Sequence, residues 1–528
     1  MSTDFNISFP PDLLRILTRW NRWGTAPLNS GVRRRITGEL APFLDTPEVV
    51  ALVGPRRAGK TTVLFQLMDD LEAAGVPREA CLHVNLEEQA LMSVMGPELL
   101  ERLYETYRVE VFPEGRAYLF LDEVQQASGW ERWVRSRNET EDVKIFVTGS
   151  SAKLMSPELA TLLTGRHVSF RVLPLEFREF LDFRGVELPA RPRLVGTPPR
   201  IQQALHAYLR WGGFPEVVLA GDERRKEVLL KQYFDDALFK DVALRHQIRD
   251  LSLLRNLAVY LLGQTASFIS AERLARIFSV SSELARTYCG YLEEAFLVSF
   301  VPFYTLKTAE RLRRPRKVYA VDTGLRNAVC LTGSPDHGRL METAVHGALE
   351  RVGHDGLFYW KDEVEVDFAV RRGLSVRSLI QVVGEGLEKV AVRTRELRSL
   401  ERARSAFPQA ERFLVAGSLP GPGSMPGEAS EDPEVRWIPL WRFLTEAGDE
   451  ARIVEGRSAA PAAPDGSAAD LEERLLRHVR RHGRVTRREA AELGGLSRPQ
   501  ASRLLGRLVE AGRIVRRGTG GGTFYALS

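Results

Sequence analysis

Residues 54–62 read GPRRAGKTT, which sets two glycines, a lysine and a hydroxyl at the spacing G-x4-G-K-[ST]. At this spacing the glycines allow backbone N–H groups to wrap a chain of phosphates, and Lys60 reaches the β- and γ-phosphates. The hydroxyl of Thr61 is placed to ligate Mg²⁺, and the helix that follows adds the positive end of its dipole. The predicted nucleotide-binding residues are Gly54, Pro55, Arg56, Arg57, Ala58, Gly59, Lys60, Thr61 and Thr62.

An acidic pair ends a later apolar run, YLFLDEVQQ. Asp122 is predicted to bind Mg²⁺ together with Thr61. Glu123 is then placed to polarise an attacking water, which favours hydrolysis over binding alone. Thr148, in KIFVTGSS, is predicted to sense the γ-phosphate, with a helix cap as the alternative. The sequence therefore predicts a site that uses ATP and Mg²⁺, with Lys60, Glu123 and Thr148 as catalytic residues.

The elements that must position these residues alternate in type from residue 49 to residue 173. EVVALVG, CLHVNL, AYLFLD and VKIFVTG are typical of strands buried on both faces of a parallel sheet. TTVLFQLMDDLEAAG is helical in pattern and closes with a glycine. This order predicts a doubly wound α/β domain. Because the carboxyl ends of parallel strands meet at one edge, Asp122, Glu123 and Thr148 are expected to share one crevice.

A second acidic constellation lies in EVDFAVRRGLSVRSLIQVV, which resembles half of the active site of PD-(D/E)xK nucleases. Asp367 is expected on the first strand and Glu342 on a preceding helix. Such sites need two or three carboxylates to hold Mg²⁺ and a lysine to orient the attacking water. Gln381 and Val383 stand where an acid and the lysine belong, so we expect a degenerate nuclease-like site at Glu342, Asp367 and Gln381 whose fold is kept and whose cleavage is lost. An active metal-dependent nuclease with a relocated lysine, for which Lys389 is a candidate, is the alternative.

The end of the chain is its most basic part. Residues 470–528 carry 13 arginines, no lysine and 6 acids, whereas the whole chain has a net charge of only +5. A basic terminal module favours a polyanionic partner. RVTRREAAELGG, LSRPQASRLLGRLVEAG, IVRR and TFYAL follow the order of a winged helix-turn-helix, which binds DNA, with a protein-binding winged helix as the alternative. The predicted DNA-binding residues are Arg498, Gln500, Ser502, Arg503, Arg507, Arg516 and Arg517.

Residues 268–320 repeat the winged-helix order. FISAERLARIFSVSSELARTYCGYLEEAFLVSFV is followed by a basic stretch, KTAERLRRPRK, and by VYAV. The second helix is acidic at its carboxyl end. Contact with DNA and internal packing therefore both remain open for this segment.

Taken together, GPRRAGKTT, FLDEVQ, VTGSSAKL, LTGR, PLEFREF, WGGFPE, KVYAVDTGL and EVDF resemble the prokaryotic, archaeal-type AAA P-loop ATPases close to the STAND branch. In that family the ATPase core precedes an appended domain of unknown function, and the resemblance covers residues 33–450. It implies that Arg166 contacts the γ-phosphate of its own or a neighbour's nucleotide, with a structural salt bridge as the alternative. It also implies that Pro215, in GGFP, lies beside the nucleotide base in a helical lid, with a helix-breaking turn as the alternative.

The totals fit a multidomain protein of the cytoplasm. The chain has 528 residues, 44% of them hydrophobic and 27% charged. Cys81, Cys289 and Cys330 fit no metal spacing and favour a reducing compartment. We expect no secretory signal and no membrane span. The expected domains are an N-terminal helical segment (1–32), the P-loop ATPase core (33–180), a helical lid (181–254), an internal winged helix (255–325), the degenerate nuclease-like α/β domain (326–450), a linker (451–469) and the C-terminal winged helix (470–528).

The function predicted from these features is that of a DNA-binding ATPase that remodels or acts on DNA in repair, recombination or defence. The expected partner is duplex or branched DNA, and assembly with further copies of the chain is left open. An ATP-switched, STAND-like DNA-binding regulator with slow turnover is one alternative. The active metal-dependent nuclease is the other.

Overall fold

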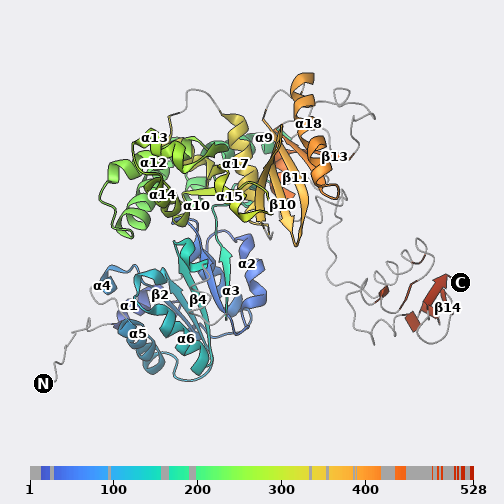
Figure 1. The fold of residues 1–528 in the computed structure, drawn as a ribbon. Coiled ribbons are helices and arrows are strands. Elements are labelled where there is room, and N and C mark those ends of the chain that lie inside the picture. The colour runs from blue at the N-terminus through green and yellow to red at the C-terminus, as the bar shows by residue number, and fades with distance from the viewer. Residues whose placement is uncertain are drawn as a thin grey trace. The chain divides into compact units, whose positions relative to one another are not determined.

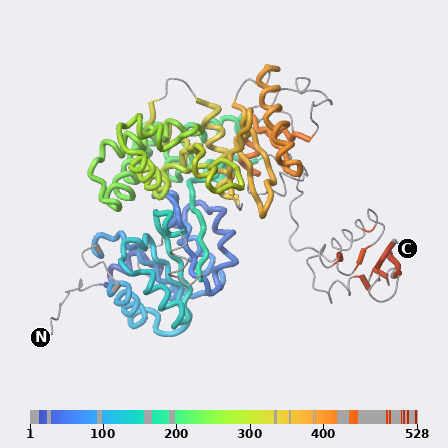
Figure 2. The backbone as a smooth tube through the Cα atoms, viewed as in Figure 1, coloured from blue at the N-terminus to red at the C-terminus, as the bar shows by residue number. Residues whose placement is uncertain are grey.

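The computed structural model describes most of the chain, which divides into two compact units, Met1–Glu455 and Gly456–Ser528. Figure 1 and Figure 2 show the two units, and each is described here by itself. The residues described are 13–23, 29–92, 97–155, 166–188, 198–331, 336–352, 356–384, 387, 389–417, 434–446, 479, 485–486, 489–490, 505–506, 508–509, 513–517 and 524–527. Among their helices none is long and apolar enough to cross a membrane.

The first unit begins with a parallel sheet of order β2-β3-β4-β1-β5 (Figure 1). Its strands are β1 (Val49–Val53), β2 (Cys81–Asn85), β3 (Ala117–Asp122), β4 (Val143–Gly149) and β5 (His167–Arg171). Alternate residues of β1 enter two separate cores, with Ala51 in one and Val50 and Leu52 in the other. The sheet is therefore covered on both faces, and the predicted α/β fold with an AAA-type parallel sheet is confirmed.

Helices precede β1 and lie between the strands from β1 to β4, in the manner of a doubly wound fold. They are α1 (Leu13–Trp20), α2 (Arg35–Leu40), α3 (Lys60–Ala73), α5 (Pro97–Glu110) and α6 (Trp130–Thr140). α1 and α5 contribute Leu17 and Leu103 to the core of one face, and α3 contributes Leu64 and Leu67 to the other.

A helical segment comes next and leads into a small antiparallel sheet of order β6-β8-β7. The helices are α8 (Phe177–Phe183), α9 (Pro199–Trp211), α10 (Pro215–Leu219), α11 (Glu223–Asp236), the π-helix η5 (Ala237–Leu244) and α12 (Leu251–Gly263). The elements after them are β6 (Ser267–Ile269), α13 (Ala271–Phe278), α14 (Ser282–Glu294), β7 (Val298–Val301), α15 (Thr308–Arg313) and β8 (Arg316–Ala320). Their order is strand–helix–helix–strand–helix–strand, which is the order predicted for a winged helix with the short helix α15 added between the last two strands.

The first unit ends in a mixed sheet of order β13-β12-β11-β10-β9. Its strands are β9 (Gly356–Lys361), β10 (Glu365–Arg372), β11 (Ser375–Val383), β12 (Glu411–Ala416) and β13 (Val435–Pro439). Its helices are α16 (Thr323–Val329), α17 (His337–Leu349), α18 (Val390–Ala406) and α19 (Leu440–Glu446). Val345 of α17 packs in the core of one face and Leu400 of α18 in the core of the other, so this sheet is also a middle layer.

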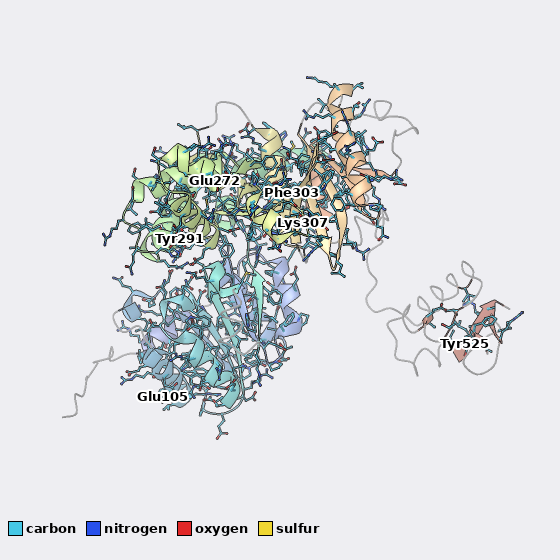
Figure 3. All side chains as sticks on the ribbon, in the orientation of Figure 1. Glu105, Glu272, Tyr291, Phe303, Lys307 and Tyr525 are labelled. Atoms are coloured by element: carbon cyan, nitrogen blue, oxygen red, sulfur yellow. The ribbon has the colours of Figure 1, made fainter. Side chains whose placement is uncertain are left out.

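The second unit is described only in part. An antiparallel hairpin joins β14 (Ile514–Arg517) to β15 (Phe524–Leu527), as the sequence predicts. Tyr525, labelled in Figure 3, packs with Val485, Leu505 and Leu508 in a small core. The backbone of Val485 pairs with that of Tyr525, which adds a third strand segment to the hairpin.

Candidate nucleotide site

The loop from β1 to α3 has the shape that its glycines permit. A Cβ on Gly54 would lie 2.0 Å from the carbonyl oxygen of Val172, so any side chain here would displace backbone. Gly59 has φ 96°, in the left-handed region that favours glycine. α3 begins directly after it, at Lys60, and its first turn points unpaired N–H groups into the loop.

Lys60 is 4% exposed and lies at the centre of the loop. Its Nζ donates to the carbonyl oxygens of Gly54, at 3.1 Å, and Pro55, at 3.2 Å. The same nitrogen is 3.3 Å from Oε1 of Glu123. The structure therefore brings the predicted phosphate-binding cation and the predicted water-polarising acid into one ion pair.

Asp122 is held by two hydroxyls from neighbouring elements. Thr61 Oγ1 donates to Oδ2 at 2.5 Å, and Thr148 Oγ1 donates to Oδ1. Burial favours the protonated form of this carboxyl, but the nearby His83 and the hydrogen bonds from Thr148 and Thr61 hold the pKa of Asp122 below its ordinary value. A charged carboxylate beside a threonine hydroxyl is a donor set that suits Mg²⁺.

Thr148 also accepts a hydrogen bond from the backbone N–H of Glu123, at 3.0 Å. Glu123 has φ 55°, a left-handed conformation that is uncommon for a residue with a Cβ. Gln125 Nε2 donates to Oε2 of Glu123 at 2.5 Å and to Ser150 Oγ at 3.3 Å. The Thr148 hydroxyl thus links the side chain of Asp122 to the backbone of Glu123. These contacts are with the two acids and do not cap a helix.

A cavity of about 400 Å³ lies over these groups, a size that suits a nucleotide. Its floor is the loop with β2 and β3, and its side is formed by α10, α11 and η5. The lining residues are Arg56, Arg57, Gly59, Lys60, Thr61, Thr62, Asn85, Glu87, Asp122, Glu123, Pro215, Glu216, Asp236 and Lys240. Pro215 therefore lines the cavity, and it is also the first residue of α10, after the turn that ends α9. Its place beside the nucleotide base stays a prediction.

Arg56 links the phosphate loop to η5. Its Nε donates to Oδ2 of Asp241 at 2.7 Å, and its Nη1 donates to Glu87 at 2.6 Å. Ser150 Oγ, directly after β4, donates to Oδ1 of Asp241 at 2.8 Å. Burial opposes the charge on Arg56, yet Asp241, Glu123 and Glu87 raise the pKa of its guanidinium overall. Asp241 was not predicted from the sequence, because nothing near it in the chain marks it.

Arg34 is a second group that the sequence did not reveal. It is 4% exposed and donates to the carbonyl oxygens of Ala58, at 2.6 Å, and Leu173, at 3.0 Å. Its Nε forms an ion pair with Glu179 at 2.9 Å. Arg34 thereby fixes the loop against the segment that follows β5. His83, 3.9 Å from Asp122, was also missed, because a lone histidine in an apolar strand carries no local signal.

Arg166 lies away from this site. It precedes β5, and its carbonyl oxygen accepts from the N–H of Val49, the first residue of β1. The phosphate loop follows the other end of β1, where Val53 pairs with Arg171. The prediction that Arg166 contacts the nucleotide of its own chain is therefore wrong, because the two lie at opposite ends of the sheet. Contact with a neighbour's nucleotide stays a prediction.

α14 is the second helix of the segment predicted to be an internal winged helix. Its acidic carboxyl end contacts the residues that follow β4 of the ATPase sheet. Glu294 accepts from Ser151 Oγ at 2.9 Å and lies 3.3 Å from Lys153 Nζ. Tyr291, labelled in Figure 3, stacks on His246 with ring centroids 3.6 Å apart. At this end of α14 the structure therefore favours internal packing over contact with DNA.

The nuclease-like residues do come together. Asp367 N donates to Gln381 Oε1 at 3.3 Å, while Glu342 and Asp367 share the ammonium of Lys317. Lys389 is exposed at the start of α18. Among the described residues, no three His, Cys, Asp or Glu side chains are grouped so as to hold a metal ion.

Most of the predicted DNA-binding residues lie in the part of the second unit that the structure does not describe. Arg498, Gln500, Ser502, Arg503 and Arg507 lie outside the described residues. Arg516 and Arg517 lie on β14, and the side chain of Arg517 is exposed.

Three family descriptions match parts of the chain. Residues 46–181 match an AAA domain, residues 202–336 a domain of unknown function (DUF8612), and residues 471–522 the MarR family. Among solved structures, AMPPCP-bound DnaA from Aquifex aeolicus is similar at 15% identity and a TM-score of 0.25, over 49% of this chain and 86% of that one. The STAND protein PH0952 from Pyrococcus horikoshii is similar at 14% identity and a TM-score of 0.22, over 62% of this chain and 47% of that one.

A curated relative is much nearer in sequence. The uncharacterized protein MJ1544 of Methanocaldococcus jannaschii is 31% identical over 365 residues, which make up 67% of this chain and 78% of that protein. This chain joins an AAA-type P-loop domain to a C-terminal winged helix that matches the MarR family. It belongs to the family of MJ1544.

Proposed function

We propose that this protein is a DNA-binding ATPase in which the nucleotide site sets the arrangement of the domains that follow it. The observation that carries the proposal is the meeting of Lys60, Thr61, Asp122 and Glu123 at one cavity. Each group comes from the carboxyl end of a parallel strand or from the helix after it. This is where open α/β sheets bind their ligands.

Each residue has a distinct proposed role. Lys60 binds the β- and γ-phosphates, and the N-terminus of α3 adds its dipole. Thr61 and Asp122 hold Mg²⁺, which neutralises charge that develops on the phosphates. Glu123 orients and polarises the attacking water, and Thr148 holds both acids in place. Pro215 and Lys240 close the side of the cavity.

The contacts of Asp241 support the coupling of this site to the rest of the unit. Phosphates that draw Arg56 inward compete with Asp241 for the same guanidinium. Any movement of Asp241 moves η5, which is continuous with α11 and packs with α12. Ser150 and Ser151 add links from the end of β4 to η5 and α14. Nucleotide binding thereby has a physical route to the winged helix.

DNA is the proposed partner because of the second unit. Its basic sequence and its match to the MarR family support a nucleic-acid-binding winged helix. The proposed work on DNA is remodelling in repair, recombination or defence, driven by ATP turnover. Duplex or branched DNA is the proposed substrate.

Two substitutions test the ATP site separately for binding and for chemistry. Lys60→Ala removes the phosphate contact, so ATP binding and turnover are both expected to be lost. Glu123→Gln keeps the shape and loses the base, so ATP still binds while turnover falls by about 100-fold or more. Turnover and the affinity for a fluorescent ATP analogue measure the two effects. Lys231→Ala, on an exposed lysine of α11, is the control and should match the wild type. Unchanged turnover in Lys60→Ala would place hydrolysis elsewhere.

A slow nucleotide switch is the second candidate. The ion pair between Lys60 and Glu123 favours it, because a glutamate held by that lysine is less free to activate water. The switch predicts stoichiometric nucleotide retained through purification and turnover that DNA does not change. A motor predicts turnover that DNA stimulates strongly. Turnover measured with and without duplex and branched DNA distinguishes the two.

A further inference from the structure

Lys317 occupies the centre of the nuclease-like carboxylate cluster. It belongs to β8, in the winged helix, and its side chain is 3% exposed. Its Nζ lies 2.9 Å from Oε1 of Glu342, 2.9 Å from Oδ1 of Asp367 and 2.6 Å from Oε1 of Glu365. One ammonium thus contacts carboxylates from α17 and β10, the two elements that the sequence assigned to a metal site.

Two further hydrogen bonds reach the carboxylates of the cluster. Tyr319 OH donates to Oε1 of Glu342 at 2.7 Å, and the N–H of Val382 donates to Oδ2 of Asp367 at 2.9 Å. Gln381 directs its Nε2 to Glu396, at 2.9 Å. The glutamine therefore faces α18 as well as the strand of Asp367, and it brings no charge to the cluster.

Charge explains why a cation is needed here. Three carboxylates within reach of one point repel each other strongly when buried. Although burial alone would lower it, the neighbouring acids raise the pKa of Lys317 well above its ordinary value, so the ammonium stays charged. Burial and Asp367 raise the pKa of Glu342 to about 7, which lets that carboxyl take up the residual proton.

We infer that the ammonium of Lys317 is a built-in replacement for the divalent cation of a nuclease site, so that the cluster joins two domains and does not cut nucleic acid. A divalent metal would have to sit about 2.0–2.2 Å from the oxygens of Glu342 and Asp367. The ammonium already contacts those same oxygens, so metal and lysine exclude each other.

The backbone around Lys317 fits this joining role. Phe303, after β7, forms a parallel bridge with Tyr359 of β9, and Tyr304 N donates to Tyr359 O at 2.8 Å. Tyr359 OH in turn donates to the carbonyl oxygen of Pro315, at 2.6 Å. In Figure 3 Phe303 lies where the winged helix meets the mixed sheet. The ion pairs of Lys317 with Glu342 and Asp367 add a side-chain link between the same two parts of the chain.

The inference is tested by counting Mn²⁺ bound to the full-length chain without nucleotide, using the electron paramagnetic resonance signal of free Mn²⁺. Lys317→Met removes the ammonium and is expected to bind one Mn²⁺ more than the wild type. It should also unfold roughly 5–10 °C lower in EDTA, with part of the loss restored by Mn²⁺. Adding Asp367→Asn to Lys317→Met should abolish the extra Mn²⁺. Any Mn²⁺ bound at the ATP site is the same in all variants, so it does not affect the difference in bound Mn²⁺ between a variant and the wild type.

Asp367→Asn alone keeps the inference testable if Lys317→Met does not fold. This single variant should bind as much Mn²⁺ as the wild type, because no metal occupies the cluster. Less Mn²⁺ in Asp367→Asn, or no gain in a folded Lys317→Met, would overturn the inference. So would Mn²⁺- or Mg²⁺-dependent cutting of DNA by the wild type that Asp367→Asn abolishes, since that would make Lys317 the relocated lysine of an active nuclease. The ATP site takes no part in this outcome.

Discussion

At the scale of single residues, Glu342 provides the most direct link between burial and a measurable property. Its side chain is 13% exposed and its pKa is about 7, raised by burial and by Asp367. The folded protein therefore holds a proton on this carboxyl in the pH range where the unfolded chain has released it. Proton binding by the folded state is a contribution to stability that disappears as pH rises through the folded pKa.

We predict that the unfolding temperature of the wild type falls, relative to that of Glu342→Gln, as pH rises from 5 to 8. Glutamine imitates the protonated carboxyl, so the variant lacks this pH dependence. The difference corresponds to up to about 3 kcal/mol and levels off about one pH unit above the folded pKa. Scanning calorimetry of both proteins at each pH measures it. A constant difference across this range would show that Glu342 titrates near its ordinary pKa.

Residue roles could be predicted from the sequence wherever the chemistry is local in the chain. GPRRAGKTT and the pair Asp122 and Glu123 are such cases, and the structure places both at one cavity. Asp241 lies 185 residues from its partner Arg56, and Lys317 lies 50 residues from Asp367. No pattern in the sequence connects such pairs. The contact of Lys317 with Asp367 therefore could not be predicted from the residues near either of them in the chain.

At the scale of elements, four strands of the first sheet could be predicted from the sequence. Each is buried on both faces, so almost all of its residues are apolar. β5, with the sequence HVSFR, lies at the edge of the sheet and is only half-buried, so it carries no such signal. Its omission also misplaced Arg166, since the direction of β5 decides which end of the sheet that residue occupies. The π-helix η5 likewise has no mark in sequence, although it carries Asp241.

The link between the phosphate loop and η5 leads to a prediction for Asp241→Asn. The neutral side chain removes one of the two ion pairs of the buried Arg56 and leaves only that with Glu87, which should cost about 2 kcal/mol of stability. ATP should slow hydrogen exchange in η5 and α14 of the wild type and have little effect there in the variant. Exchange measured by mass spectrometry with and without ATP tests this.

Asp235→Asn is the matched control for that experiment. Asp235 pairs with Arg255, and both side chains are 53% exposed. This variant should respond to ATP as the wild type does. An ATP response of η5 that survives in Asp241→Asn would show that the coupling runs through other contacts, such as that of Ser151 with Glu294.

At the scale of the whole molecule, the excess positive charge of the chain lies in residues 470–528, which belong to the second unit. Arg516 and Arg517 belong to β14, which pairs with β15 in the hairpin proposed as the wing. Contacts of wing arginines with DNA phosphates release counterions, so affinity falls steeply with salt. Each phosphate contact contributes about 0.9 to the slope of log K against log salt for duplex DNA.

We therefore predict that the double variant Arg516→Ala and Arg517→Ala of the full-length chain binds duplex DNA with a salt slope shallower by about 2. The loss should be similar for unrelated DNA sequences, because phosphates carry no sequence information. Turnover of ATP without DNA should stay at the wild-type level, because neither arginine belongs to the ATP site. Arg255→Ala, an exposed arginine of the first unit, should leave the slope unchanged. Fluorescence anisotropy at several salt concentrations measures all of these slopes. An unchanged slope in the double variant would remove the wing from the DNA interface and favour a protein as the partner of this winged helix.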